Sequence, residues 1–189
     1  HDYWIKPREE ILNGTESADT RWTYTYHRRL AEYEIEGEVI DQIDYMVRKL
    51  SQTGFSRRAQ GITWNTKLYP TTEHPPRLQR IRGRLVEDDD AKLVFNMNTH
   101  RRSRDLYKAW FENVIALRTL LRKIAERISD EISRPVRVGR YVDFSDSLHI
   151  YGSYFWELEG DPEKGIKSFF EHLMSRSFED RTWSSDFVR

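Results

Sequence analysis

Three arginines and a serine lie within the segment 99–105 (THRRSRD), just before an apolar run that begins at Leu106. Guanidinium groups, hydroxyls and the free N–H groups at a helix start all bind phosphate or carboxylate. Arginine runs that only face water give the same pattern. The segment is either an anion-binding site or a solvated basic surface, and the residues alone leave both interpretations open.

The composition limits the chemistry that is possible. The 189 residues include no cysteine, which excludes disulfides, thiolate metal sites and thiol nucleophiles. Thirty-one Lys and Arg residues balance thirty-one Asp and Glu residues, so no overall positive field attracts nucleic acid. No apolar run approaches the roughly 20 residues of a membrane span. We expect a cytoplasmic protein that binds neither membrane nor nucleic acid, and the scattered histidines predict no metal site.

Hydrophobic periodicity predicts a single domain of the α/β (α+β) class. Apolar spacings of three and four residues predict helices over 37–50, over ~25 residues from Arg104, and over 161–176. Alternating or β-rich stretches predict strands at 21–30, 59–65, 78–86, 92–99 and 136–144. The acidic turn at 87–90 joins two of these strands into a hairpin. The helix from Arg104, on the order of 37 Å long, is expected to be the central buried helix.

Polar residues beside these apolar patterns are candidate site residues. Asn113 lies next to the apolar stripe of the long helix, so its amide is either bonded to protein or faces a ligand. His149 is either a satisfied interior histidine or a site residue. The segment 21–30 is either a half-buried strand or the carrier of a ligand-facing tyrosine. Residues 56–58 (SRR) form a second basic spot with a hydroxyl.

Several segments, taken in order, resemble the thymidylate synthase and pyrimidine hydroxymethylase family, particularly its archaeal-type branch. They are 26–30 (YHRRL), 56–60 (SRRAQ), 63–65 (TWN), 75–80 (PPRLQR), 96–98 (NMN), 102–105 (RSRD), Asn113 and 146–151 (DSLHIY). The resemblance is clearest over residues 20–160. It implies one thymidylate synthase-like domain over residues 1–189, with a mixed sheet on a long central helix and a sheet-to-sheet homodimer. The N-terminal portion of the family is not expected in this chain.

The resemblance also implies how a pyrimidine nucleotide would be held. Arg102 and Ser103 are similar to the residues that bind its 5′-phosphate. Arg57 and Arg58 are similar to the pair that reaches across the dimer to the phosphate of the partner subunit. Gln79 is a further expected substrate contact.

The base and sugar contacts follow from the same resemblance. Asn113 is similar to the asparagine that reads the uracil edge, and Asp105 to the aspartate near the folate and the base. His149 and Tyr151 are similar to the pair that binds the sugar hydroxyl. Each of these is an expectation about this chain.

The chain departs from the family pattern at the position of the nucleophile. In the family a cysteine follows the Pro-Pro pair, and its thiolate attacks C6 of the pyrimidine so that C5 takes a one-carbon unit from methylenetetrahydrofolate. Here that position is Arg77, whose guanidinium stays protonated and offers no lone pair. Arg101, where many relatives have an uncharged residue or glutamine, makes the pocket more cationic, although Arg77 is free to pair with an acidic neighbour.

Two functions remain compatible with these residues. One is a divergent one-carbon transferase that binds a pyrimidine nucleotide-like substrate and methylenetetrahydrofolate without covalent activation. It would use a base such as Tyr26, which matches the tyrosine used in proton transfer better than Tyr24 does. The other is a catalytically inactive nucleotide-binding or regulatory homologue. Nucleic-acid binding through residues 101–104 is disfavoured by the zero net charge.

Overall fold

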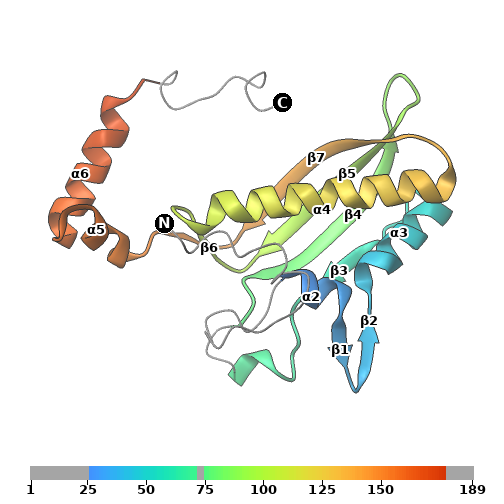
Figure 1. The fold of residues 1–189 in the computed structure, drawn as a ribbon, viewed down its shortest axis with the longest axis horizontal. Helices are drawn as coiled ribbons and strands as arrows, with labels where there is room; N and C mark the ends of the chain where they lie inside the picture. The colour runs from blue at the N-terminus through green and yellow to red at the C-terminus, as the bar shows by residue number, and fades with distance from the viewer. Residues whose placement is uncertain (1–25, 72–74, 178–189) are drawn as a thin grey trace, which may run out of the picture.

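A computed structural model of the chain describes residues 26–71 and 75–177. Its centre is a four-stranded mixed sheet with the strand order β3-β4-β5-β7 (Figure 1). The strands are β3 (Gln60–Ile62), β4 (Leu78–Glu87), β5 (Leu93–Arg101) and β7 (Val136–Ser145). Neighbouring strands are antiparallel from β3 to β5, whereas β5 and β7 are parallel. The expected mixed α/β fold is confirmed.

Two small sheets accompany the central one. An antiparallel pair is formed by β1 (Tyr33–Ile35) and β2 (Glu38–Ile40), and a parallel pair by β6 (Arg104–Asp105) and β8 (Leu148–His149). The parallel pair lies just beyond the ends of β5 and β7. The chain runs from β5 into β6 through the predicted anion-binding segment, and from β7 into β8.

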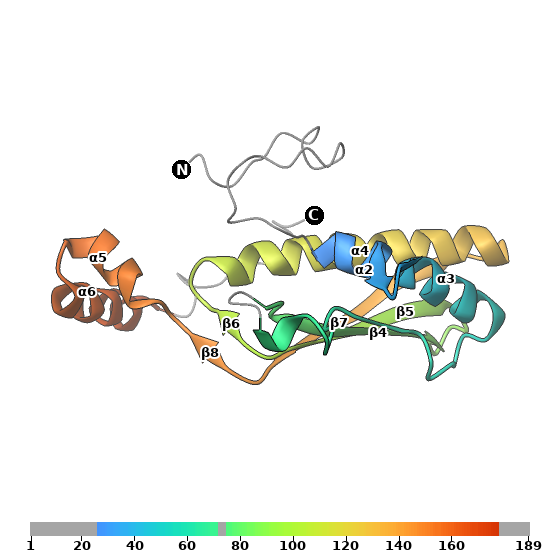
Figure 2. The ribbon, with the colours of Figure 1, turned by 90° about the horizontal axis from the view of Figure 1, so that it is seen from below.

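The helices lie mainly on one face of the central sheet, as Figure 2 shows. They are α2 (Tyr26–Ala31), α3 (Gln42–Gln52) and α4 (Ala109–Ile132), with a 3₁₀ turn η2 (Tyr69–Thr71) in the loop before β4. Two further helices, α5 (Gly152–Glu159) and α6 (Pro162–Ser175), pack on one another beyond the end of the sheet (Figure 1). Within the described residues no helix covers the other face of the sheet.

The core lies between the sheet and the helices α3 and α4. Phe95 and Met97 of β5 are fully buried, while Asn96 and Asn98 point to the opposite face, which confirms the alternation expected of the hairpin. Gly83 on β4 allows a close approach, because a Cβ there would lie 2.5 Å from Phe95 Cε2. The apolar stripe of α4 is buried only over its second half, from Leu117 to Ile128.

The long helix begins later than predicted. Arg104 and Asp105 form β6, and the 24-residue helix starts at Ala109. The reason is local, because Asp105 Oδ1 accepts hydrogen bonds from the N–H of Tyr107 (3.0 Å) and Lys108 (3.4 Å), and Oδ2 from that of Ala109 (3.3 Å). The carboxylate satisfies the free N–H groups of the helix start from outside the helix.

Two other boundaries differ from the predictions. Residues 26–30, predicted as strand, form helix α2, because the consecutive residues Arg29 and Leu30 are both buried, which suits a helix face better than an alternating strand. Residues 21–25 lie outside the described part. The helix predicted from residue 37 starts at Gln42, where Asp41 accepts the N–H of Asp44 at 2.8 Å as an N-cap. Helix α5 was not predicted.

The pairing of β5 with β7 contains one extra residue on β7. Phe95 pairs with Val138, whereas Met97 pairs with Tyr141. Asn96 Oδ1 accepts the N–H of Arg140 at 2.6 Å inside this irregularity. It is a β-bulge, which places two residues of one strand opposite one residue of the other.

Candidate functional site

The arginine segment lies where the parallel strands β5 and β7 both end. The side chains of Arg101 and Arg104 are 2% and 5% exposed, so the alternative of a solvated basic surface is wrong for these two residues. Arg102 and Ser103, between β5 and β6, are half-buried. This edge of the sheet positions the residues predicted to bind an anion.

Arg102 is fixed by the Pro-Pro segment. Its Nε donates to the carbonyl of Pro76 at 3.1 Å and its Nη2 to that of Pro75 at 2.9 Å. Its backbone N–H donates to the carbonyl of Arg77 at 3.0 Å. Gln79 Nε2 donates to the carbonyl of Pro76 at 2.8 Å. Arg77, Gln79 and Arg102, three of the predicted site residues, therefore lie around the Pro-Pro turn. The Nη1 of Arg102 makes no hydrogen bond to the described residues.

Among the residues that the structure describes, Arg77 pairs with a tyrosine and with no acidic residue. Its Nη2 donates to the hydroxyl of Tyr151 at 2.5 Å, and its guanidinium carbon lies 5.9 Å from the centroid of that ring. Tyr26 lies beside the same turn, because its hydroxyl accepts the N–H of Leu78 at 3.4 Å. The guanidinium of Arg101 lies 5.3 Å from the centroid of the Tyr26 ring. The structure thus brings together the residues at the expected base and nucleophile positions.

Asp105 is a buried, ionised anchor. Burial opposes ionisation of this carboxyl, but the hydrogen bond from Tyr154 and those from the backbone N–H groups of residues 107–109 outweigh it and lower the pKa of Asp105. The Tyr154 hydroxyl donates to Oδ2 at 2.7 Å. Both oxygens of Asp105 are already occupied by the chain itself.

Asn113 and His149 retain polar atoms that are free of hydrogen bonds. The Nδ2 of Asn113 donates to the carbonyl of Ala109 at 2.5 Å, so the amide is tied to its own helix and its Oδ1 makes no hydrogen bond to the described residues. The Nε2 of His149 is buried and likewise has no partner among them. Its ring meets that of Tyr151 edge-on at 4.7 Å. His149 is therefore not a fully satisfied interior histidine in the described part of the chain.

Arg57 and Arg58 are not part of this cluster. They line a separate hollow of about 470 Å³ with residues of α3 and β3, among them Gln42, Gln60 and Ile62. No described residue of the arginine segment lines that hollow. The basic residues of segment 56–58 therefore lie apart from those of segment 99–105 within a single chain.

Comparison with known proteins gives three results. No protein-family model matches the chain. A Methanocaldococcus jannaschii protein named "putative thymidylate synthase" is 36% identical over 147 residues, which cover 76% of this chain and 60% of that protein. A Methanosarcina acetivorans protein of the same name is 28% identical over 162 residues, covering 84% and 65%. The fold is similar to thermostable thymidylate synthase A from Bacillus subtilis, with a TM-score of 0.53, 20% identity, and 81% of this chain and 52% of that chain covered. In sequence and in fold the chain is similar to the thymidylate synthases.

This thymidylate synthase-like chain spans between about three fifths and two thirds of the length of the curated relatives it matches. The family resemblance read from the sequence is confirmed, and so is the mixed α/β fold it implied, whereas the sheet-to-sheet homodimer stays a prediction. Within residues 26–71 and 75–177, no helix is long and apolar enough to cross a membrane. The same residues contain no group of three or more His, Asp or Glu side chains placed to hold a metal ion.

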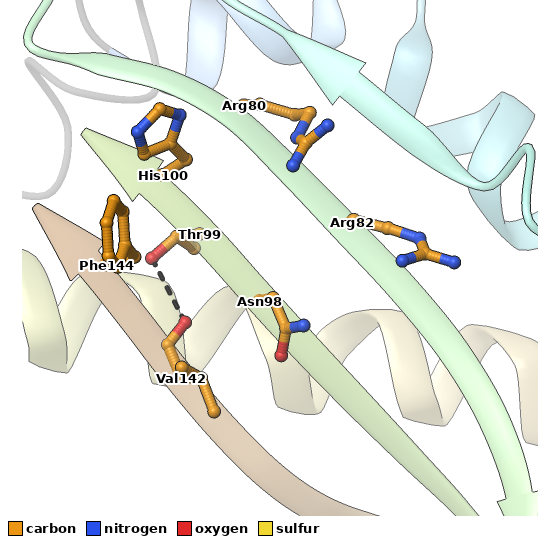
Figure 3. A pocket seen from close by; sticks show the side chains of 7 residues that line it. All are labelled: Arg80, Arg82, Asn98, Thr99, His100, Val142 and Phe144. Atoms are coloured by element: carbon orange, nitrogen blue, oxygen red, sulfur yellow. Dashed lines mark hydrogen bonds between the residues drawn. The ribbon is translucent and has the colours of Figure 1, made fainter. Parts of the chain in front are cut away.

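The uncovered face of the sheet carries a feature that sequence reasoning missed. Arg80 and Arg82 of β4 lie on this face beside His100 of β5 and Phe144 of β7, around a hollow of about 300 Å³ (Figure 3). The signal was present in residues 80–84 (RIRGR), where every second residue is arginine and therefore points to the same face. In this thymidylate synthase-like fold the face combines basic and exposed aromatic side chains.

Proposed function

We propose that this chain binds the phosphate of a pyrimidine nucleotide-like ligand at Arg102 and Ser103. The observation that carries the proposal is the excess of positive charge at this edge of the sheet. Four arginines lie there: Arg101, Arg102 and Arg104, and Arg77, whose carbonyl accepts the N–H of Arg102. In the described part of the chain, Asp143 pairs with Arg101 and Arg104, and both oxygens of the neighbouring Asp105 are occupied by the chain itself. A phosphate dianion would balance the remaining charge and accept charge-assisted hydrogen bonds from Arg102.

Two unsatisfied polar atoms support a nucleotide more than a free phosphate. The buried Nε2 of His149 and the free Oδ1 of Asn113 lie on segments that lead away from the arginine cluster, on β8 and α4. The buried Nε2 of His149 is costly to leave without a partner, whereas Asn113 is only half-buried. A sugar hydroxyl and a base edge offer hydrogen-bond partners to these two atoms. The proposal therefore extends from the phosphate to the nucleoside.

We further propose that the chain transfers a one-carbon unit without a covalent nucleophile. Arg77 cannot replace a thiolate, so the substrate carbon must already be electron-rich, and the chain has only to orient it and accept its proton. Tyr26 is the proposed base because its hydroxyl lies beside the turn that carries Arg77. Methylenetetrahydrofolate would supply the one-carbon unit, and Asp105 does not fit a direct folate contact because both of its oxygens are held by the chain itself.

One observation favours the alternative, a catalytically inactive nucleotide-binding homologue. The hydrogen bond from Arg77 to the Tyr151 hydroxyl engages the group that the resemblance assigns to the sugar. A ligand would have to displace Arg77 or accept a different sugar position. A nucleotide bound beside this contact would not have the sugar position of the family reaction, which favours a homologue that binds without catalysis.

A homodimer through the uncovered sheet face is part of the same proposal. Phe144 is 59% exposed and Val142 39% exposed on that face, which suits an interface between chains. Arg57 and Arg58 lie apart from Arg102 in one chain, and a sheet-to-sheet pairing is the arrangement in which they would serve the phosphate of the partner subunit.

The experiment that tests the proposal is calorimetric titration with dUMP, dCMP, dTMP and deoxyuridine. We expect binding of at least one monophosphate and much weaker binding of deoxyuridine, which lacks the phosphate. Tritium release from C5 of a bound pyrimidine, with methylenetetrahydrofolate added, separates the transferase from the inactive homologue. Absence of binding to every monophosphate would reject both functions.

A further inference from the structure

Two buried arginines flank the proposed phosphate-binding residues. Arg101 directly precedes Arg102, and Arg104 directly follows Ser103. Arg101 Nε lies 3.4 Å from Asp143 Oδ1, and Arg104 Nη2 donates to Asp143 Oδ2. The Asp143 side chain is 8% exposed. One carboxylate on β7 therefore holds both ends of the four-residue segment.

The surrounding hydrogen bonds tie the same segment to the chain that follows β7. The carbonyl of Arg101 accepts the N–H of Asp146 at 2.9 Å, and the N–H of Arg104 donates to the carbonyl of Ser147 at 2.8 Å. The Tyr141 hydroxyl donates to Asp143 Oδ2 at 2.7 Å. Burial, outweighing an opposing hydrogen bond from Thr99, raises the pKa of Tyr141 to about 12, so this hydroxyl remains a donor at neutral pH.

Stability alone does not account for this arrangement. Two guanidinium groups share one carboxylate, and Arg101 Nε, Arg101 Nη2 and Arg104 Nε are buried without a hydrogen bond to the described residues. Buried charges with unsatisfied N–H groups cost free energy, and well-packed apolar side chains in their place are often neutral or stabilising. The position of the charges, on either side of Arg102 and Ser103, points instead to the anion site.

We propose that Asp143 is a positioning residue of the anion site. Together with Arg101 and Arg104 it forms a buried bridge, the Arg101–Asp143–Arg104 bridge, that fixes Arg102 and Ser103 in the conformation that receives the phosphate. Asp143 acts through the two arginines and does not touch the ligand. The inference rests on the proposed function, since it requires an anion at Arg102.

The first test is Asp143→Asn in the full chain, with dUMP and deoxyuridine titrated by calorimetry. We expect a rise of about tenfold or more in the Kd for dUMP and no comparable change for deoxyuridine, because only the phosphate contact depends on the bridge. The control is Leu121→Ala, which removes apolar contacts of α4 in the core and no polar group of the bridge. It is expected to lower the melting temperature and leave the Kd for dUMP unchanged at temperatures where circular dichroism shows a native fold.

A second variant keeps the inference testable if Asp143→Asn does not fold. Arg104→Lys retains the charge but loses the planar set of N–H donors that meets Asp143, and Arg127→Lys, at the surface pair with Asp44, is its matched control. We expect weaker dUMP binding only for Arg104→Lys. If folded Asp143→Asn or Arg104→Lys binds dUMP within about twofold of the unchanged chain, the bridge does not position the site. If the unchanged chain itself binds no monophosphate, the proposed function fails and the inference fails with it.

Discussion

Replacing Arg77 by cysteine tests the identity of the position where the family has its nucleophile. The side chain of Arg77 is half-buried, and within the described part of the chain it makes one hydrogen bond, from Nη2 to the hydroxyl of Tyr151. Its carbonyl, which accepts the N–H of Arg102, is retained in any variant. A bond of this kind at a partly exposed site contributes about 1 kcal/mol or less, so we expect Arg77→Cys to fold and to keep Arg102 in place.

The chemical outcome is then a clear contrast between variants. With dUMP binding first verified, we expect Arg77→Cys to debrominate 5-bromo-dUMP in the presence of a reducing thiol, because a thiolate beside C6 provides the missing nucleophile. The unchanged chain and Arg77→Ala, which removes the same hydrogen bond without adding a thiol, are expected to give no reaction. If Arg77→Cys binds dUMP as well as the unchanged chain and still does not debrominate the analogue, residue 77 does not face C6, and the reasoning about this position is refuted.

Three further outcomes are expected. Gly83→Ala should lower the free energy of unfolding by about 1–3 kcal/mol in urea titrations, because its Cβ would lie 2.5 Å from Phe95 Cε2. The pKa of Asp105 is lowered in the folded state, so its carboxylate stabilises the fold above the pKa of an unfolded aspartate and this contribution is lost as pH falls through the lower folded pKa. Asp105→Asn should therefore make stability fall less steeply as the pH is lowered, which is measured as the urea midpoint of unfolding at a series of pH values. Phe144→Asp should shift the protein from dimer to monomer in sedimentation velocity, because it places a charge on the proposed interface.

Matched variants give each outcome its control. Gly152→Ala adds the same methyl group where nothing lies within 4 Å of the new Cβ, and it should leave the urea midpoint nearly unchanged. Asp146→Asn, an exposed aspartate whose pair with His100 is on the surface, should leave the steepness of the acid limb largely as it is. Arg122→Glu, on the outward side of α4, should not change the oligomeric state. Equal effects in a variant and its control would contradict the corresponding reasoning.

The hairpin of β4 and β5 shows what could be predicted from the sequence. The alternation of Phe95 and Met97 with Asn96 and Asn98 specifies both the strand and its buried face, because side chains in a strand have a period of two. The acidic turn between the strands is likewise a local signal. The hairpin was therefore predicted from local signals, whereas helix α2 was predicted as a strand and helix α5 was not predicted.

The boundaries of α4 and the burial of the arginines could not be predicted in this way. The segment 104–105 becomes a strand because it pairs with Leu148 and His149, more than forty residues later. Arg101 and Arg104 are buried because they meet Asp143 on β7. These contacts are non-local, and a charged run in the sequence alone carries no sign of them.

The segment 99–105 was nevertheless singled out from its residue types as a candidate anion-binding site. The roles of Arg102, Ser103 and Asn113 came from the family resemblance, which the comparisons confirm at the level of the family. Those roles remain predictions for this chain. The bridge through Asp143 had no sequence signal, because aspartate in a predicted strand is common and its partners are forty residues away.

The β-bulge between β5 and β7 decides which side chains of β7 reach the interior. Side chains alternate along a strand, so the extra residue next to Gly139 and Arg140 reverses the facing of everything that follows it. Without it Val142 would point inward and Asp143 would point to the uncovered face. A deletion of a single residue at this place would thus disconnect Asp143 from both arginines while leaving all three side chains in the sequence, so the length of this strand matters to the site as much as its composition.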